Sequence, residues 1–352
     1  MNGSSSSVGP DVGASSSADA GQRSAEREEP TGSTRAEQRA RAAAWLASYG
    51  MVLVLVVVIV VAQALNSGFA EPGNVRNIFS QNAALGLVAI GATFVIIGGG
   101  FDLSAGAMYA LGGVVYAQLA TTGTPVLAAV VLTVLCGTLV GLVNGVLVNG
   151  LRINPFVATL GSSSMILGLA YVISDSLPIS ALGVEGFDTL GRERLFDLTY
   201  SVYLFLFVFL LAAFLLHATV WGRNIFALGG NREAARLAGV RTRFLSISTY
   251  VASGSLAALG GVVIASRTSV GQPNIGGTIA LDAITVVIVG GTTLFGGEGA
   301  IWRTFIGLMI LGILRNTFDS LALSNATQLV ATGAILVAAV AMDAVVRERR
   351  GG

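Results

Sequence analysis

The sequence predicts an all-α, polytopic membrane protein of about ten transmembrane helices, with both termini in the cytoplasm. Hydrophobic residues make up 53% of the 352 residues and charged residues 11%, with a mean hydropathy of +0.77. That composition excludes an ordinary soluble domain. The chain also carries repeated apolar runs of about the length that crosses a bilayer. Its arginines gather in alternate connections between these runs, as expected for a polytopic protein.

The apolar runs give the expected spans in chain order. They are residues 45–65, 81–98, 103–121, 126–148, 156–174, 199–219, 247–266, 279–289, 302–321 and 327–346. The segment 66–77 is polar, and Glu71-Pro72-Gly73 is expected to break it. The longest internal polar loop is 175–198. The eighth run is short, with glycine and proline before it and glycine after it.

Residues 1–44 are predicted to be a disordered cytoplasmic tail, because Ser, Gly, Ala and charged residues dominate there. This segment lacks the apolar core of a secretory signal peptide. Residues 45–346 form the expected transmembrane domain, and residues 347–352 form a short basic cytoplasmic C-terminus.

The arginines set the orientation. All 20 basic residues are arginine, and only Arg76, Arg192, Arg194 and Arg267 fall in segments counted as outer, while Arg315 lies within the ninth span. The others lie in segments that the count places in the cytoplasm. Positive charge is retained on the cytoplasmic side of membrane proteins. We therefore expect residues 221–243 in the cytoplasm and the loop 175–198 outside.

Missing residue types exclude several kinds of chemistry. A Walker-type phosphate loop needs a lysine, and the chain has none. His217 is the only histidine and Cys136 the only cysteine, so a His-pair zinc site and an intrachain disulfide are impossible, and we expect no metal site. Paired aspartates could indicate an intramembrane protease, but no Gly-x-Gly-Asp arrangement occurs. An enzyme is therefore a poor interpretation.

Glycine is the second compositional signal, with 46 residues. Glycines within spans, such as Gly137, Gly141 and Gly254, predict close packing of helices. Three clusters differ, because they interrupt apolar runs: residues 98–100, 290–291 and 296–297. Such breaks are tolerated in a membrane only where the backbone is buried in protein or lines a cavity, as in transporters.

The most charged internal segment is residues 221–243. Within it, residues 231–238 predict a short helix, because Asn231 is a good N-cap, Glu233 lies in the first turn and Gly239 ends the helix. A short capped helix between two spans is a rigid body that a partner can push. The alternative is an ordinary solvated loop.

Several motifs then resemble one family, the permeases of ribose-type monosaccharide ABC importers. Residues 98–106 read GGGFDLSAG, residues 154–161 NPFVATLG, residues 222–240 GRNIFALGGNREAARLAGV and residues 290–299 GGTTLFGGEG. Gly271-Gln272-Pro273 and Leu281-Asp282-Ala283-Ile284 also fit the family pattern. The matches run in order over most of the membrane region, from about Leu85 to Asp343. Phe101 and the apolar pair Ile279-Ala280 depart from the pattern, and so does the long N-terminal tail.

The resemblance implies that residues 231–239 are the coupling helix, which docks into a separate ATP-binding subunit. The residues expected to serve this contact are Gly222, Arg223, Gly230, Asn231, Glu233, Ala234, Ala235 and Gly239. ATP and Mg²⁺ would bind on that partner, so this chain would need no cofactor. An extracytoplasmic sugar-binding protein and a second permease copy, identical or paralogous, complete the implied assembly in a bacterial inner membrane.

We further expect polar groups along a translocation pathway, since a sugar needs neutral or acidic hydrogen-bonding groups. The candidates are Asp102, Ser104, Asn154, Thr159, Gln272, Asn274 and Asp282. For each, the alternative is a helix cap or an interhelical hydrogen bond. For Asp102, capping of the third span is the specific alternative.

Three functions remain open at this point. The first is the permease of an ATP-driven monosaccharide importer. The second is the same architecture importing another solute, such as a branched-chain amino acid or a nucleoside. The third is a secondary transporter or a membrane enzyme, which these motifs favour less. A secondary transporter would need no docking helix.

Overall fold

The computed structural model describes the backbone of residues 35–351, and the side chains of residues 50–341 except Asn325 and Ala339. The chain divides into two units, residues 1–47 and 48–352, and the second unit carries the fold and the candidate sites. The helix that begins at Arg35 starts within the segment predicted to be disordered; residues 1–34 of that segment lie outside the described residues.

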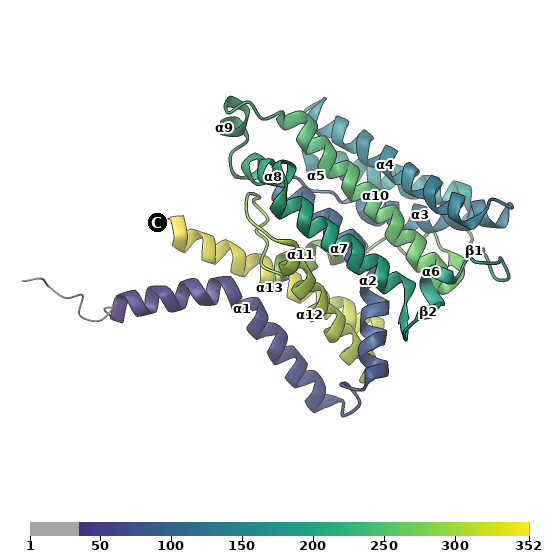
Figure 1. The fold of residues 1–352 in the computed structure, drawn as a ribbon, viewed down its shortest axis with the longest axis horizontal. Helices are drawn as coiled ribbons and strands as arrows, with labels where there is room; N and C mark the ends of the chain where they lie inside the picture. Colours follow the sequence, from purple (N-terminus) through teal and green to yellow (C-terminus); the bar gives the residue numbers. More distant parts are fainter. Residues whose placement is uncertain (1–34, 352) are drawn as a thin grey trace, which may run out of the picture. The chain divides into compact units, whose positions relative to one another are not determined.

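The described chain is almost entirely helical (Figure 1). Its elements are α1 Arg35–Leu65, α2 Pro72–Ile97, α3 Ser104–Thr121, α4 Val126–Asn149, α5 Pro155–Ile173, β1 Ile179–Ser180, α6 Thr189–Arg192, β2 Arg194–Leu195, β3 Leu198–Thr199, α7 Tyr200–Ala218, α8 Val220–Gly230, α9 Arg232–Leu237, α10 Thr242–Thr268, β4 Val270–Gly271, α11 Ile279–Val289, α12 Ile301–Ser320 and α13 Asn325–Gly351.

Each of the predicted ranges contains a helix, and the prediction of a helical, multi-spanning fold is confirmed. Among the described residues, five helices are long and apolar enough to cross a membrane: α2, α4, α5, α7 and α10. The start of α2 was predicted wrongly. Glu71-Pro72-Gly73 does not separate the helix from a polar loop; Pro72 is instead the first helical residue. Proline fits there because its missing N–H would be unpaired in the first turn anyway.

Helices α2 and α10 form the interior. In α2, 89% of the most apolar window is buried, and in α10 56%. In α4, α5 and α7 only 22–28% is buried, so these helices leave most of their apolar surface uncovered. Apolar surface of that extent is stable in lipid, which makes α4, α5 and α7 the outer helices.

Glycine lets α4 lie against α10. A Cβ atom on Gly254 of α10 would collide with the carbonyl oxygen of Gly137, and one on Gly141 with the carbonyl of Tyr250. The expectation that glycines within spans permit close helix packing is therefore confirmed.

The chain between α10 and α11 begins as strand β4 and continues through turns over residues 273–278, with Gly271 and Gly276 packed against α3. β4 pairs with β1 through Ile179↔Gly271 and Ser180↔Val270. From there the backbone follows α3, with Gly271 against Gly113 and Gly276 against the carbonyl of Gly106. α11 then begins beside the first turns of α3. The short eighth span is thus a half-length helix preceded by a short strand and turns, with its predicted bounds.

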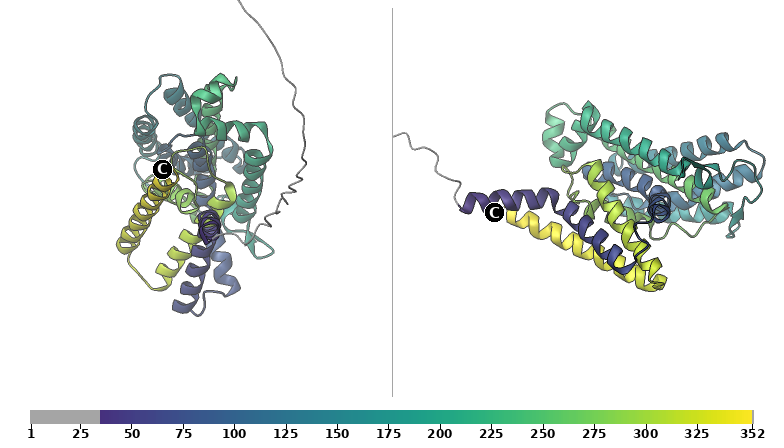
Figure 2. Two further views of the ribbon diagram at one scale, coloured as in Figure 1. Left: turned by 90° about the vertical axis from the view of Figure 1, so that its left-hand side faces the viewer. Right: turned by 60° about the horizontal axis from the view of Figure 1, so that its bottom comes forward.

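The two ends of α10 carry different structures. α8 and α9 lie at the end where α10 begins, and the segment with β1, α6 and β2 lies at the other end (Figures 1 and 2). The orientation predicted from arginines assigns the first end to the cytoplasm and the second to the outside.

Candidate docking segment and solute cavity

Helix α8 fixes the base of the docking segment, which we define as residues 220–239. Thr219 caps α8 by accepting the N–H of Gly222 at 3.2 Å. The indole N–H of Trp221 donates to Ser248 Oγ on α10 at 2.8 Å, and the ring meets Phe94 of α2 edge-on at 5.1 Å between centroids. α8 is therefore tied to both interior helices.

Glycines allow α8 to lie directly on two loops. A Cβ on Gly229 would collide with the carbonyl of Ile97, and one on Gly297 would approach Gly230. The N–H of Gly297 donates to the carbonyl of Ile97 at 2.8 Å. The predicted helix breaks at 98–100 and 296–297 thus meet each other beside α8, and they pack against protein backbone, although Gly99 is exposed and Gly296 and Gly297 are half-buried.

Helix α9 has the caps that the sequence predicts. The Asn231 side chain accepts the N–H of Ala234 at 2.9 Å. At the other end, Gly239 has a φ of +85°, and the N–H groups of Gly239 and Val240 donate to the carbonyls of Arg236 and Ala235, both at 3.0 Å. This is a Schellman motif, which satisfies the last carbonyls of the helix. The capped helix is confirmed.

The two faces of α9 differ. Ala235 is buried against the protein, whereas Ala234 and Ala238 are exposed and Leu237 is 78% exposed. Glu233 and Arg236 form an exposed bidentate ion pair, with Nη2–Oε1 at 2.6 Å, and this contact lowers the pKa of Glu233. A partner that docks on the exposed face would therefore contact the apolar side chain of Leu237 and the small side chains of Ala234 and Ala238, beside the Glu233–Arg236 ion pair.

Arginines surround α9 in two settings. The guanidinium of Arg232 donates to the Asn149 side chain at the end of α4, at 2.8 Å. Arg236, Arg241 and Arg243 line an open hollow of about 410 Å³ at the start of α10. Gly222 is buried and Arg223 exposed on α8, so the predicted coupling residues all lie in the docking segment.

A buried polar cluster lies at the start of α3. We call it the Asp102 cluster, and it consists of Asp102, Ser104, Asn144 and Ser253, which are at most 6% exposed. Asp102 accepts the N–H of Ser104 at 3.0 Å, the hydroxyl of Ser104, and the hydroxyl of Ser253 at 2.7 Å. Asn144 donates to Ser104 Oγ at 2.7 Å.

Asp102 thus caps the first turn of α3, as the capping interpretation predicts. Its side chain also has a second role. The carboxylate caps the first turn of α3 and also joins that turn to α10. Within the described part of the chain no cation forms an ion pair with Asp102. Its hydrogen-bond donors are instead the N–H and hydroxyl of Ser104 and the hydroxyl of Ser253.

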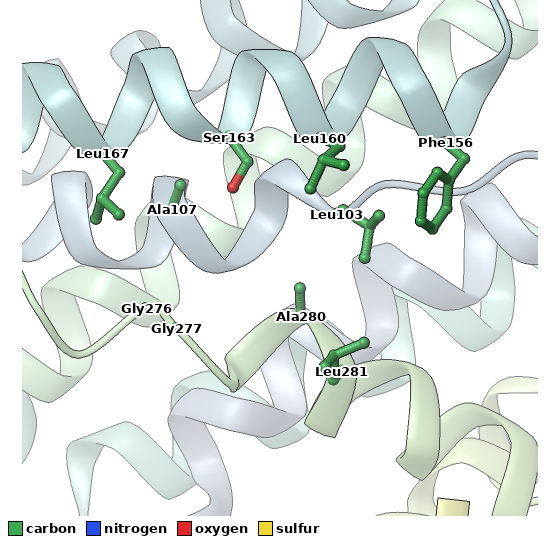
Figure 3. Close-up of a pocket in the computed structure, with 10 residues that line it drawn as sticks. All are labelled: Leu103, Ala107, Phe156, Leu160, Ser163, Leu167, Gly276, Gly277, Ala280 and Leu281. Carbon is green, nitrogen blue, oxygen red and sulfur yellow. The ribbon is translucent and has the colours of Figure 1, made fainter. Parts of the chain in front are cut away.

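A cavity of about 380 Å³ opens beside this cluster. Side chains of α5 form one wall, residues 276–281 form the other, and Leu103 and Ala107 of α3 lie between them (Figure 3). The lining is Leu103, Ala107, Phe156, Leu160, Ser163, Leu167, Gly276, Gly277, Ala280 and Leu281. No ionisable side chain is among them, and Ser163 supplies a hydroxyl.

The candidate pathway residues lie in four places. Asp102, Ser104 and Thr159 are close together, since Thr159 Oγ1 accepts the N–H of Leu103 at 3.2 Å. Asn154 is exposed and caps α5 by accepting the N–H of Phe156 at 2.9 Å. Gln272 and Asn274 lie in the turn-rich segment between β4 and α11, half-buried and exposed respectively.

Asp282 is not part of the Asp102 cluster. Its carboxylate is paired with Arg315 of α12 at 2.7 Å, with the side chains 9% and 32% exposed. Asn144 and Ser253 are not among the residues that the sequence predicted. An asparagine inside the very apolar run of α4 was the available signal, because a polar amide in a span needs a partner.

Together these features define a multi-pass helical membrane protein with a half-length helix, a buried polar cluster and an open cavity, features that transporters share. The chain belongs to the family described as branched-chain amino acid transport system / permease component, which matches residues 74–340. No solved structure matches it.

Curated relatives are similar over most of their length. The chain is 37% identical to the ribose import permease protein of Bacillus subtilis (strain 168), covering 84% of this chain and 92% of the relative. It is 35% identical to the D-allose transport system permease protein of Escherichia coli (strain K12), covering 84% and 91%. The L-arabinose transport system permease protein of the same strain is 36% identical, with 84% and 90% covered.

Proposed function

We propose that this chain is the membrane permease of an ATP-driven importer that carries a monosaccharide, a ribose-like pentose or a related sugar, into a bacterium. In this proposal the chain spans the inner membrane about ten times, with both termini in the cytoplasm. The relatives named above are permeases for ribose, allose and arabinose, and the resemblance of motifs points to the same class.

The cavity lining carries the choice of solute. A branched-chain amino acid, which the family description names, is a zwitterion and would bring two charges into the cavity. Burying a charge without a partner is very costly. The lining holds no ionisable side chain, so a neutral sugar fits it better. The hydroxyl of Ser163 and the exposed backbone of Gly277 are the groups available for sugar hydroxyls.

The docking segment carries the proposal of ATP-driven transport. α9 is capped at both ends, tied to the protein on one face, and presents Leu237 on the other. Such a helix transmits the motion of a partner instead of absorbing it. ATP binding on two partner subunits would move two copies of α9, and the cavity would open alternately to each side. An extracytoplasmic binding protein would deliver the sugar at the segments around 175–198 and 269–280.

Co-purification tests this function. The tagged chain is purified from its native membrane as it stands, with Leu237→Glu, and with Leu182→Glu as a matched control. Leu182 is 72% exposed in the opposite loop. We expect an ATPase subunit to accompany the unchanged chain and the control, and to be lost with Leu237→Glu. Ribose and other neutral monosaccharides should then stimulate ATP hydrolysis when the binding protein is added.

Two outcomes would contradict the proposal. If no ATPase ever associates and transport follows an ion gradient, the chain is a secondary transporter. If hydrolysis responds to leucine or valine and not to sugars, the solute assignment is wrong and the assembly stands.

A further inference from the structure

We propose that a polar relay links α9 to the wall of the cavity. Four side chains, Arg232 of α9, Asn149 and Asn144 of α4, and Ser253 of α10, act through Ser104 and Asp102 at the start of α3. The inference rests on the proposed function, because it explains how movement of α9 reaches the solute.

The first link joins α9 to α4. Arg232 Nη2 donates to Asn149 Oδ1 at 2.8 Å, and Asn149 Nδ2 donates to the carbonyl of Gly145 at 2.9 Å. Asn149 is 3% exposed. Because both polar atoms of its amide are bonded, the side chain has a fixed position. Movement of Arg232 therefore acts on the end of α4 and not on a loose side chain.

The second link runs from α4 to the start of α3. Asn144 lies on the same helix as Asn149 and donates to Ser104 Oγ at 2.7 Å. Ser104 in turn donates to Asp102. Close contact keeps α4 and α10 together, since a Cβ on Gly145 would lie 2.9 Å from the Cα of Ile247. A shift of α4 is thus passed to the first turn of α3.

The third link comes through α10, which follows α9 directly in the chain. Ser253 donates to the other oxygen of Asp102 at 2.7 Å. Asp102 is therefore held by α4, through Ser104, and by α10. Both helices begin or end next to α9, so the docking segment controls Asp102 from two sides.

The relay ends on the cavity wall. Leu103 lies between Asp102 and Ser104 in the chain, and Leu103 and Ala107 both line the cavity. The N–H of Leu103 donates to Thr159 on α5, the opposite wall. A displacement of the first turn of α3 therefore changes the separation of the walls.

One atom of the relay is left without a partner. Asn144 is 1% exposed, and its Oδ1 accepts no hydrogen bond from the described residues. A buried acceptor without a donor is costly and calls for an explanation. A second arrangement, in which α3 or α10 shifts and offers that oxygen a donor, supplies one. A relay with two arrangements is what alternating access requires.

The test measures transport and ATP hydrolysis together, in proteoliposomes holding the full complex and the binding protein. The variants are Arg232→Ala and Asn149→Leu, with Asn149→Asp as the conservative variant, because its carboxylate still accepts from Arg232. Arg152→Ala is the matched control: Arg152 is exposed just beyond α4, and its side chain forms no ion pair with the described residues. Mutations in coupling networks change coupling by about two- to thirtyfold.

We expect the ratio of sugar transported to ATP hydrolysed to fall by about two- to thirtyfold with Arg232→Ala and with Asn149→Leu. The ATPase should still co-purify with both variants. Asn149→Asp and the control should keep the normal ratio. A merely structural role would lower the yield of the complex and leave the ratio unchanged. Arg232 is exposed, so its variant folds even if Asn149→Leu does not.

A normal ratio in Arg232→Ala with the complex intact overturns the relay and leaves the proposed function standing. Absence of any ATPase from the unchanged protein overturns both, and is seen before any variant is made.

Discussion

The ion pair between Asp282 and Arg315 gives the sharpest test of the structure, because it alone joins charged side chains of α11 and α12 in the described chain. Asp282 lies in the first turn of α11, which follows a short strand and turns, and its carboxylate is 9% exposed. The Nη2–Oδ1 distance is 2.7 Å. We infer that the pair fixes the half-length helix against α12 and that Asp282 binds no solute.

The magnitude depends on burial. Removing one partner of a buried pair costs about 3–5 kcal/mol, since the other charge is left without compensation. Arg315 is 32% exposed, so after loss of Asp282 it can reach solvent or lipid headgroups. We therefore expect Arg315→Met to cost about 3–5 kcal/mol and Asp282→Leu to cost less, about 1–3 kcal/mol. The double variant should recover about 1–3 kcal/mol of the summed loss, because it buries no charge.

The assay is a double-mutant cycle on the purified protein in detergent, with unfolding followed by circular dichroism. We expect the two single changes to be non-additive by about 1–3 kcal/mol, as for residues in direct contact. Additivity within about 0.5 kcal/mol would refute the reasoning, since groups that do not interact behave in that way. Transport by the double variant would show in addition that Asp282 is dispensable for recognition of the solute.

Three further expectations concern packing, charge and orientation. Gly137→Ala should destabilise the protein by about 1–3 kcal/mol in the same unfolding assay, because the new Cβ meets the carbonyl of Gly254; the control Gly168→Ala has nothing within 4 Å and should be neutral or stabilising. The lowered pKa of Glu233 means that its ion pair with Arg236 is complete above the ordinary carboxyl value of 4.5 and is lost as pH falls through the lowered value. Binding of the ATPase should therefore be constant from about pH 8 to about pH 6 in the unchanged chain, because Glu233 stays ionised throughout that range, and a dependence that survives Glu233→Gln would come from another group. With Cys136 replaced by alanine, Leu237→Cys should react with an impermeant maleimide only from the cytoplasmic side and Leu182→Cys only from outside; the reverse pattern would invert the topology.

The docking helix could be predicted from the sequence because everything that makes it is local. Asn231 and Gly239 act on backbone groups a few residues away, and their chemistry does not depend on the rest of the fold. The apolar runs predicted most helix ends to within a few residues, but α1, α2 and α10 begin about ten, nine and five residues before the predicted starts. The start of α2 was missed because Pro72 ends a helix in most positions and begins one at the first turn.

The Asp102 cluster could not be predicted as a cluster. Asn144 and Ser253 come from helices that the sequence places far from Asp102, and the contacts exist only because glycines bring α4, α10 and α3 together. The sequence shows each polar residue as an exception in an apolar run, but it does not show which residue is its hydrogen-bond partner. The same limit applies to Asp282 and Arg315: the sequence shows each as a charged residue in a predicted span, but it does not show that they form a pair.

Packing also decides how the candidate site residues divide. The side chains of Asp102, Ser104 and Asp282 are hydrogen-bonded or paired to protein groups, and Asn154 caps a helix. Gln272 and Asn274 lie in the turn-rich segment before α11, a few residues from Gly276 and Gly277 of the cavity lining. In the proposed function, a permease that receives its solute from a binding protein needs little affinity of its own, and a cavity lined by one hydroxyl and no ionisable side chain is consistent with that expectation.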